Sequence, residues 1–460
     1  MPPTLSWSDL RGRSVGIYGL GREGEANLRK CLALGLDPVL VDDDGRRPDI
    51  DGRPILRTAE GGHAALAECE VVIKTPGISR YGKVVRDLTE RGIPVAGGLG
   101  LWLMEADRSK VACFTGTKGK STTTAIAGQL LAGLGYRCLV GGNIGVPPYD
   151  PRLAGEPYDY WVIEVSSYQS TDLACAPPVF AVTSLDPDHL PWHRDDPEIY
   201  YGDKLSACRL PGADLTVANG DSERIRARRN LLGPRVEWVH AGDDPGADWM
   251  EPLGLLGAFN RRNALIAQRC LRALGVPEAG DTDALRAAAP GFTVLESRLE
   301  VIGSVGAVTF VNDSLSTNVL SALSAVDAFP DRRIALIAGG SDRGIDYRPL
   351  AEGLRRRSAD LLLITVPDSG TEIHRQVTET GPGPLVTVTE AEDLTGAVLD
   401  GYRWARPDGL VLLSPAAASF GTFRDYRDRA DVFAAAMRLC AETSRTPVRD
   451  PHAPLRSVHR

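Results

Sequence analysis

The chain has 460 residues and a formal net charge of −8, with 52 lysines and arginines against 60 aspartates and glutamates. This acidic balance argues against a nucleic-acid-binding surface, which requires clustered cations. Hydrophobic residues make up 43% of the chain and charged residues 24%, as in globular proteins with sizeable cores. At roughly 100–200 residues per domain, the length predicts three domains.

The eight cysteines are scattered, mostly within apolar runs, and none forms a Cys-x-x-Cys pair. This distribution predicts buried thiols in a reducing compartment rather than disulfides or a zinc site. The first residues lack the long apolar stretch of a signal peptide. No run approaches the ~18 apolar residues of a transmembrane helix. We therefore expect a cytoplasmic protein without a membrane span, and we expect a monomer.

Strand and helix signals alternate from the start of the chain. Strands are predicted at residues 14–18, 38–42 and 71–75, and a helix at residues 25–34. Together they predict a βαβ domain over residues 1–106.

A second α/β region is predicted over residues 107–294. Its first strand, at residues 110–114, runs into a glycine-rich turn, and a helix follows at residues 121–134. The other predicted elements are strands at 160–165, 179–183 and 215–218 and helices at 197–208 and 263–274.

A third alternating region is predicted over residues 295–446. Its predicted elements are strands at 307–311, 333–338, 361–365 and 409–413 and helices at 319–328 and 390–404. Three α/β domains in series imply mostly parallel sheets, with ligands at the carboxyl ends of the strands. Residues 447–460 are rich in Pro and Arg and are predicted to be disordered.

The strongest chemical signal is Thr115-Gly-Thr-Lys-Gly-Lys-Ser-Thr122, where a strand feeds a glycine turn that opens a helix. Glycines let backbone N–H groups converge on phosphates, and a helix N-terminus favours an anion. Lys120 is placed to reach the β/γ-phosphates, and the Ser121 hydroxyl to bind Mg²⁺. The usual eight-residue pattern begins with Gly where this chain has Phe114. The sequence nonetheless predicts an ATP site.

A second glycine turn, Gly19-Leu-Gly-Arg-Glu-Gly24, follows the first strand, and Asp42 ends the next strand. Taken alone, this pattern is a dinucleotide fingerprint with the acid on a ribose hydroxyl. It indicates a nucleotide or pyrophosphate site without specifying NAD.

Polar residues follow the strands of the second region. Glu164 ends one strand and His189 lies just after another, so both are expected near the loop phosphates, where one carboxylate and one histidine suffice for Mg²⁺. Asn143 lies in a turn where its amide could meet a phosphate or sugar, and Lys204 alone is interpreted as a solvated helix lysine. The remaining residues of this segment are expected in structural roles: Asp186 and Asp188 as turn or cap residues and His193 at the surface.

These motifs, in this order, resemble the Mur ligase family of ATP-dependent amide ligases of peptidoglycan assembly. The similar segments are TGTKGKSTT, GGNIG, EVSSYQ, DPDH, the helix with Lys204, GAFNRRNALIA, SRLE, NDSLSTN, AGGSDRG and SPAAASF. The resemblance spans nearly the whole chain. It is closest to the ligases that add glutamate to UDP-N-acetylmuramoyl-L-alanine through an acyl phosphate, in cell wall biogenesis, cell shape and cell division.

The resemblance implies a Rossmann-like UDP-binding first domain, a P-loop ATPase-like second domain and a Rossmann-like third domain that binds the amino acid and closes on ATP. It implies catalytic roles for Lys120, Lys204, His189 and Glu164. The implied ATP ligands are Gly116, Thr117, Lys118, Gly119, Lys120, Ser121, Thr122, Asn260, Asn263, Arg298 and Asp313. The implied Mg²⁺ ligands are Ser121, Glu164, His189 and Lys204, the last as a carbamate. The implied UDP-substrate contacts are Gly19, Leu20, Gly21, Arg22, Glu23, Asp42, Gly77 and Asn143.

The third region departs from the D-glutamate-adding members of the family. Leu315 stands where those members carry Lys, and Arg343 replaces the Lys of a GGxxK pattern. Arg343 is the candidate carboxylate clamp because arginine pairs with carboxylates in two parallel bonds; Ser419 and Phe420 complete the predicted amino-acid site. The pattern resembles the subgroup that adds L-glutamate and is followed by a separate epimerase.

Three alternatives remain open at this point. The first is another Mur-type or folylpolyglutamate-type amide ligase; the N-terminal nucleotide domain argues against the folylpolyglutamate type, because that domain is expected to handle a UDP-linked substrate. A non-enzymatic P-loop regulator would not explain Lys204 beside Glu164 and His189. An NAD-dependent oxidoreductase would bind its nucleotide at the N-terminal glycine turn, so the predicted phosphate loop of residues 115–122 would have no ligand.

Overall fold

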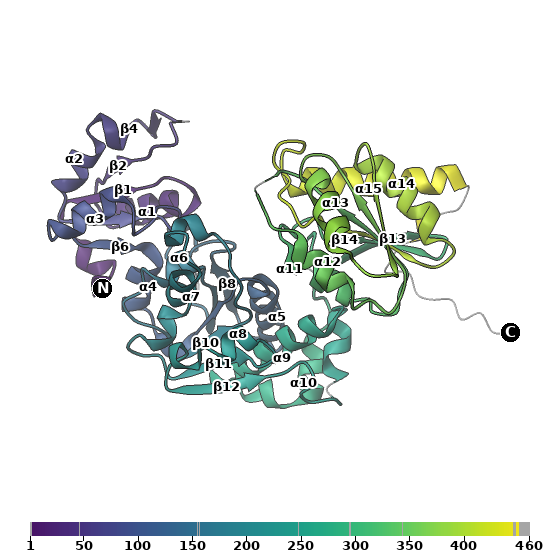
Figure 1. Ribbon diagram of the computed structural model, residues 1–460. Helices are drawn as coiled ribbons and strands as arrows, with labels where there is room; N and C mark the ends of the chain where they lie inside the picture. The colour runs from purple at the N-terminus through teal and green to yellow at the C-terminus, as the bar shows by residue number, and fades with distance from the viewer. Residues whose placement is uncertain are drawn as a thin grey trace. The chain divides into compact units, whose positions relative to one another are not determined.

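The computed structural model describes residues 2–45, 47–153, 155, 157–246, 248–293, 296–342, 344–444 and 448–449. The chain divides into two compact units, residues 1–253 with 260–292 and residues 254–259 with 293–460 (Figure 1). The first unit contains two sheets and the second contains one. The three-sheet α/β fold predicted from the sequence is therefore confirmed.

The N-terminal sheet has the strand order β3-β4-β2-β1-β5-β6, and only the short β3 runs antiparallel to its neighbour. The strands are β1 (Val15–Tyr18), β2 (Val39–Val41), β3 (Asp49–Ile50), β4 (Arg53–Leu56), β5 (Val71–Lys74) and β6 (Val95–Gly97). The helices are α1 (Arg22–Ala33), α2 (Gly62–Ala67), α3 (Lys83–Glu90) and α4 (Gly98–Glu105). β1 and β5 are buried along their whole length, as expected for parallel strands covered on both faces.

The central sheet is entirely parallel, with the order β12-β11-β10-β7-β9-β8. Its strands are β7 (Val111–Thr115), β8 (Cys138–Gly142), β9 (Tyr160–Glu164), β10 (Val179–Val182), β11 (Leu215–Asn219) and β12 (Arg235–Val239). Its helices are α5 (Lys120–Gly133), α6 (Ser167–Ser170), α7 (Pro197–Leu205), α8 (Glu223–Arg226), α9 (Ala258–Ala273) and α10 (Thr282–Ala288). The order places the carboxyl ends of β7, β9 and β10 side by side, which is where the predicted site residues follow.

The two sheets of the first unit share one hydrophobic cluster, which includes Trp7 and Ile17 from the N-terminal part and Cys113 and Phe180 from the central part. A buried ion pair also joins them, with Lys74 Nζ 2.5 Å from Asp172 Oδ2. These contacts hold the N-terminal and central sheets together as one body.

The C-terminal sheet has the order β17-β16-β15-β18-β14-β13-β19, in which β13 is antiparallel to both of its neighbours. Its strands are β13 (Glu300–Val305), β14 (Val308–Asn312), β15 (Ile334–Ala338), β16 (Leu361–Thr365), β17 (Val386–Glu390), β18 (Leu410–Leu413) and β19 (Val448–Arg449). Its helices are α11 (Val319–Asp327), α12 (Arg348–Leu354), α13 (Ser369–Thr380), α14 (Leu394–Ala405) and α15 (Tyr426–Ser444).

Alternate residues of β15 enter two different cores. Ile334 and Leu336 pack with α11, α12 and α13, whereas Ala335 and Ile337 pack with α14 and α15. The helices therefore cover both faces of this sheet (Figure 1), and the period-two side-chain direction of a strand explains the division.

Two expectations about the chain as a whole can be compared with the fold. Seven of the eight cysteines are buried and Cys138 is partly buried, all as free thiols, as predicted. The disorder predicted for residues 447–460 is wrong for Val448–Arg449, which pairs with β13 because that edge offers backbone hydrogen bonds; the rest of that tail lies outside the described residues. Within the described ranges, no helix has both the length and the apolar character needed to cross a membrane.

Candidate active site

The predicted phosphate loop lies between β7 and α5, as the sequence indicated. Gly116 and Gly119 adopt φ values of 145° and 86°, which side chains with a Cβ rarely tolerate. A Cβ on Gly116 would stand 2.1 Å from Thr183 Oγ1. The loop is held from below by Ser184, whose carbonyl oxygen accepts from Thr117 N at 3.0 Å and whose Oγ accepts from Lys118 N at 2.7 Å. Both glycines are therefore required for the turn that opens α5.

Two lysine ammonium groups meet at this loop. Lys120 Nζ donates to the carbonyl oxygens of Gly116 at 2.7 Å and Thr117 at 3.1 Å. Lys204 Nζ, from α7, donates to the same Gly116 oxygen at 3.1 Å. The Lys204 side chain is only 2% exposed, so the interpretation of this residue as a solvated helix lysine is wrong. Burial, and then the nearby charge of Lys120, holds the pKa of Lys204 well below its usual range.

Glu164 lies at the carboxyl end of β9, next to β7, and is 1% exposed. Asn143 Nδ2 donates to Glu164 Oε1 at 2.7 Å, so the two predicted residues meet. Glu164 Oε2 is buried and has no hydrogen-bond partner among the described residues. A buried carboxylate oxygen without a donor is costly, and a hard cation such as Mg²⁺, which prefers oxygen ligands, fits it.

His189 and the acidic residues before it follow β10. The side chain of His189 is 61% exposed, and its backbone is left-handed with φ 52°. Asp188 pairs with Lys118, Nζ to Oδ2 at 3.5 Å, and Asp186 forms an ion pair with Arg224. Asp186 and Asp188 were expected as turn or cap residues; both side chains instead pair with cations around the loop.

The prediction that His193 lies at the surface is wrong, because its side chain is fully buried. Its Nδ1 is 2.7 Å from Asp203 Oδ2, and its Nε2 is 3.2 Å from Ser167 Oγ. Its ring stacks on Tyr168, with centroids 5.6 Å apart. Both ring nitrogens therefore have hydrogen-bond partners, which offset the free-energy cost of burying a polar ring. The sequence carried no signal for Asp203, which precedes Lys204 on α7.

The N-terminal glycine turn connects β1 to α1. A Cβ on Gly24 would stand 2.1 Å from the Gly19 carbonyl oxygen, which explains the close approach of helix and strand. Asp42 Oδ2 accepts from Leu20 N at 2.5 Å and thereby fixes the turn. Arg22 donates to the Asn143 carbonyl oxygen at 2.5 Å. The predicted UDP-substrate residues thus reach the central domain.

Glu23 of the same turn is also bound to the central domain. Gln169 Nε2 donates to Glu23 Oε1 at 2.8 Å. Burial raises the pKa of Glu23 to about 7, despite the opposing effect of that hydrogen bond. Gly77, by contrast, is exposed in the loop after β5.

The two predicted asparagines lie on α9, both buried, and Asn263 Nδ2 donates to Asn260 Oδ1 at 3.3 Å. A Cβ on Gly119 would stand 3.0 Å from Asn263 Oδ1, so this amide borders the phosphate loop. The first unit thus brings together the loop, Glu164, Asn143, Lys204 and Asn263.

In the C-terminal unit, Asp313 follows β14 and is buried. Ser414 Oγ donates to Asp313 Oδ2 at 2.8 Å, and Leu299 N donates to Oδ1 at 3.3 Å. Burial raises the pKa of Asp313 to about 6, and Arg298 opposes this effect. Ser419 is buried, Phe420 is 58% exposed, and Arg343 lies outside the described residues.

Sequence reasoning missed Arg429 of α15, a cation that is only 1% exposed. Its guanidinium donates to Ser314 Oγ at 3.0 Å, to the Ser314 carbonyl oxygen at 2.7 Å and to the Ala417 carbonyl oxygen at 3.2 Å. It therefore ties together the loops after β14 and β18. An arginine within an amphipathic helix gives no sequence signal for such a role.

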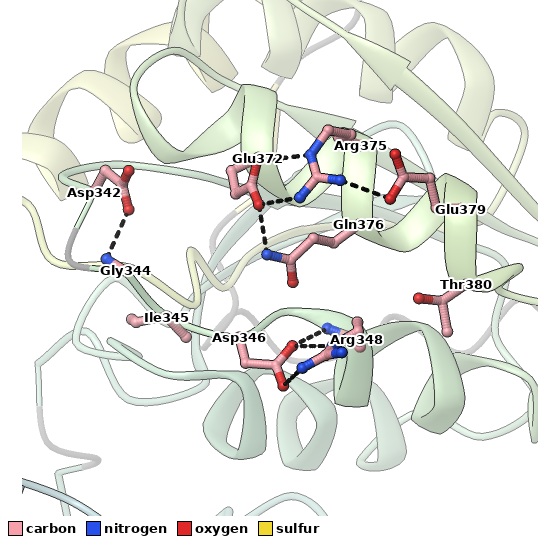
Figure 2. Close-up of a pocket in the computed structure, with 10 residues that line it drawn as sticks. All are labelled: Asp342, Gly344, Ile345, Asp346, Arg348, Glu372, Arg375, Gln376, Glu379 and Thr380. Carbon is pink, nitrogen blue, oxygen red and sulfur yellow. Dashed lines mark hydrogen bonds and ion pairs between the residues drawn. The ribbon is translucent and has the colours of Figure 1, made fainter.

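A cavity of about 460 Å³ in the C-terminal unit lies between the β15–α12 loop and α13 (Figure 2). Its charged groups pair with one another: Arg375 with Glu372 at 2.5 Å, and Arg348 with Asp346 at 2.8 Å. Asp342 and Gly344, which flank Arg343 in the sequence, line it. None of the predicted site residues that the structure describes lines it.

Comparison with known proteins adds two family matches. Residues 114–252 match the family described as Mur ligase middle domain, and residues 297–417 match Mur ligase, glutamate ligase domain. A UDP-N-acetylmuramoyl-L-alanine–L-glutamate ligase of Micromonospora sp. is 38% identical over 94% of this chain and 98% of its own. The ligase of the same name from Xanthomonas euvesicatoria pv. vesicatoria is 35% identical over 93% and 95%.

Solved structures share the fold at low identity. The MurF ligase of Thermotoga maritima in complex with ADP aligns with a TM-score of 0.54 and 14% identity, over 96% of this chain and 97% of its own. The UDP-N-acetylmuramate-alanine ligase of the same organism aligns with a TM-score of 0.50 and 17% identity, over 94% and 99%.

Proposed function

This chain belongs to the Mur ligase family of ATP-dependent amide ligases, and we propose that it joins L-glutamate to UDP-N-acetylmuramoyl-L-alanine in the synthesis of peptidoglycan precursors. The observation that carries the proposal is the convergence of Lys120 and Lys204 on the Gly116 carbonyl oxygen, beside the buried carboxylate of Glu164. The Lys120 ammonium at a helix N-terminus suits a polyphosphate, and the Glu164 carboxylate, beside Lys204 as the proposed carbamate, suits its metal.

ATP is proposed to bind along the phosphate loop. Lys120, Ser121 and Thr122 form the first turn of α5, and the backbone N–H groups at the N-terminus of a helix favour an anion such as phosphate. Asn263 borders Gly119, which supports contacts of Asn260 and Asn263 with the nucleotide. In the C-terminal unit, Arg298 is proposed for a phosphate and Asp313 for the ribose.

Mg²⁺ is proposed to be held by Ser121, Glu164, His189 and Lys204, the last after carbamylation. When bound, the metal supplies charge neutralisation for phosphoryl transfer. The unpartnered Glu164 Oε2 supports the carboxylate ligand. For Lys204, burial beside Lys120 disfavours a second ammonium charge, and a carbamate would convert it into an anionic group.

The reaction is proposed to proceed in two steps. A carboxylate oxygen of the alanyl substrate attacks the γ-phosphorus of ATP, which releases ADP and forms an acyl phosphate. The glutamate amino group then attacks the acyl carbon, inorganic phosphate leaves, and the amino proton passes to a base. Lys120 stabilises the negative charge that develops on the transferred phosphoryl group.

The substrate sites are assigned on the same family basis. The UDP-substrate is proposed to contact Gly19, Leu20, Gly21, Arg22, Glu23, Asp42, Gly77 and Asn143. The bond from Arg22 to the Asn143 carbonyl oxygen supports a site that spans the N-terminal and central sheets. Arg343, Ser419 and Phe420 are proposed for glutamate. We further propose that the protein is a cytoplasmic monomer. Its product is proposed to pass to a separate glutamyl epimerase.

The test is phosphate release from ATP and Mg²⁺ in the presence of UDP-N-acetylmuramoyl-L-alanine, with L-glutamate or D-glutamate in parallel. We expect turnover with L-glutamate alone. Turnover with D-glutamate alone would keep the ligase and contradict the handedness. If neither amino acid supports phosphate release, the proposed substrate is wrong. Binding of NADH without binding of the UDP-sugar would favour an oxidoreductase.

A further inference from the structure

The loop of residues 76–81, which follows β5 in the N-terminal sheet, makes hydrogen bonds and a ring contact with the short 3₁₀ helix Leu190–His193 of the central domain. Trp192 Nε1 donates to the Pro76 carbonyl oxygen at 3.1 Å, and Ser79 Oγ donates to the Trp192 carbonyl oxygen at 3.0 Å. The rings of Tyr81 and Trp192 meet edge to face, with centroids 5.9 Å apart. The segment that begins at His189 is therefore held from outside its own domain.

Tyr81, at the end of this loop, also reaches α7. Its hydroxyl lies 2.8 Å from Asp203 Oδ1 and 2.9 Å from Oδ2, so it donates to the carboxylate. Burial, and then Asp203, raises the pKa of Tyr81 to about 12, which keeps the hydroxyl protonated. Oδ2 of the same carboxylate lies 2.7 Å from His193 Nδ1, within hydrogen-bond distance.

This arrangement joins two proposed metal ligands through one carboxylate. Asp203 immediately precedes Lys204 on α7, so its position fixes the last turn of that helix. His193 closes the 3₁₀ helix that starts after His189, and Ser167 holds its other nitrogen at 3.2 Å. A shift of Asp203 would therefore displace both Lys204 and His189 relative to the phosphate loop.

We propose that the Tyr81 hydroxyl is a positioning group for ligation, which holds Asp203 and His193 and thereby sets Lys204 and His189 against the loop of residues 115–122. The inference rests on the proposed function of Lys204 and His189. Because residues 76–81 also include Gly77, a proposed substrate contact, one loop joins the UDP-substrate site to the reacting groups. Tyr81 itself does not touch the reacting atoms in this proposal.

The first test is the steady-state kinetics of Tyr81→Phe, which removes only the hydroxyl. Groups that orient metal ligands typically account for about 10–100-fold in activity. We expect kcat to fall by that factor, with unchanged KM for ATP and for UDP-N-acetylmuramoyl-L-alanine. A wild-type kcat, or a raised substrate KM with an unchanged kcat, would overturn the proposal.

Tyr136→Phe is the matched control. The hydroxyl of Tyr136 also donates to a carboxylate of the first unit, Glu278 Oε2, at 2.9 Å. Tyr136 lies in the turn between α5 and β8, outside the loop of residues 76–81. The variant should keep the wild-type kcat. Asp203→Asn should reproduce the effect of Tyr81→Phe, and the double variant should be no slower than Asp203→Asn, because both changes break one network.

Hydrogen exchange of the protein without substrates gives a second measurement that needs no turnover. In Tyr81→Phe, amides of α7 should exchange faster, whereas those of α5 should keep their wild-type rates. Unchanged exchange in α7 would overturn the positioning role even if the variant were slow. If wild-type protein shows no turnover with either glutamate, the proposed function fails, while α7 exchange still decides whether Tyr81 holds that helix.

Discussion

The ammonium groups of Lys120 and Lys204 donate to one acceptor, the carbonyl oxygen of Gly116, at 2.7 and 3.1 Å. Lys120 comes from the start of α5 and Lys204 from the last turn of α7. Burial, and then the charge of Lys120, lowers the pKa of Lys204. The shared acceptor places Lys204, the residue proposed for carbamylation, directly beside the predicted phosphate site.

Replacement of Lys120 by alanine should abolish most ATP-dependent turnover. Removing one charged donor from a developing phosphoryl charge is expected to cost about 10²–10³-fold in kcat. Phosphate release measures the effect. Lys110→Ala, at an exposed lysine just before β7, should behave like wild type; a Lys120→Ala enzyme with near-normal rates would contradict the loop assignment.

Lys204→Ala should be inactive but partly restored by short carboxylates, such as acetate or formate. A small carboxylate can enter the space of the buried side chain and take the place of the proposed carbamate. Activity is measured as a function of added carboxylate. Full activity of the variant without any addition would mean that Lys204 has no part in the reaction.

Glu23→Gln should remove a pH dependence of stability. Because the folded-state pKa of Glu23 is raised to about 7, above that of the unfolded chain, its contribution is fully present at low pH and is lost as the pH rises through about 7. The wild-type free energy of unfolding should therefore fall from about pH 5 to about pH 8 by more than that of Glu23→Gln. Urea unfolding measures the difference.

The exposed Glu68, at the end of α2, offers the matched control for this comparison. Glu68→Gln should keep the wild-type pH dependence of stability. An identical slope in wild type and Glu23→Gln would show that the carboxyl of Glu23 is ionised in the folded protein throughout this range.

Arg429→Met should destabilise the C-terminal unit by about 3 kcal/mol, because the buried oxygens of Ser314 and Ala417 lose charged donors. Urea unfolding with a probe in that unit checks the value. Arg403→Met, which breaks an exposed ion pair with Asp400, should leave stability almost unchanged. Equal stability of the two variants would show that water replaces the lost contacts of Arg429.

The elements that sequence patterns predicted well are those with strong local signals. β16 begins and ends at the predicted residues, β9 and β10 end one residue earlier than predicted, and β7 is displaced by one residue at both ends. These strands were predictable because buried parallel strands are continuous apolar runs. Eight of the described strands were not predicted, namely β3, β4, β6, β8, β12, β13, β17 and β19. Strands of two residues depend on neighbours that lie far away in the sequence, as β19 depends on β13.

The candidate site divides in the same way. Gly116 and Gly119 were predictable because a turn that opens a helix needs backbone conformations that glycine allows. Lys204 on a helix and His193 near a turn resemble ordinary surface residues, and both are buried. The His193 ring contacts Asp203 and Tyr168, and Lys204 Nζ contacts the Gly116 carbonyl oxygen, so these partners come from other parts of the chain.

By itself the sequence determined the strand–turn–helix phosphate loop, the series of three α/β domains and the membership of the Mur ligase family, because these depend on local periodicity, glycine geometry and motif order. Only the tertiary structure decided that Lys120 and Lys204 share one acceptor, and that Tyr81 binds Asp203. It also decided that one buried oxygen of Glu164 has no hydrogen-bond partner within the described part of the chain. Burial and hydrogen bonding between distant residues set the charge and position of a side chain, and no local pattern encodes them.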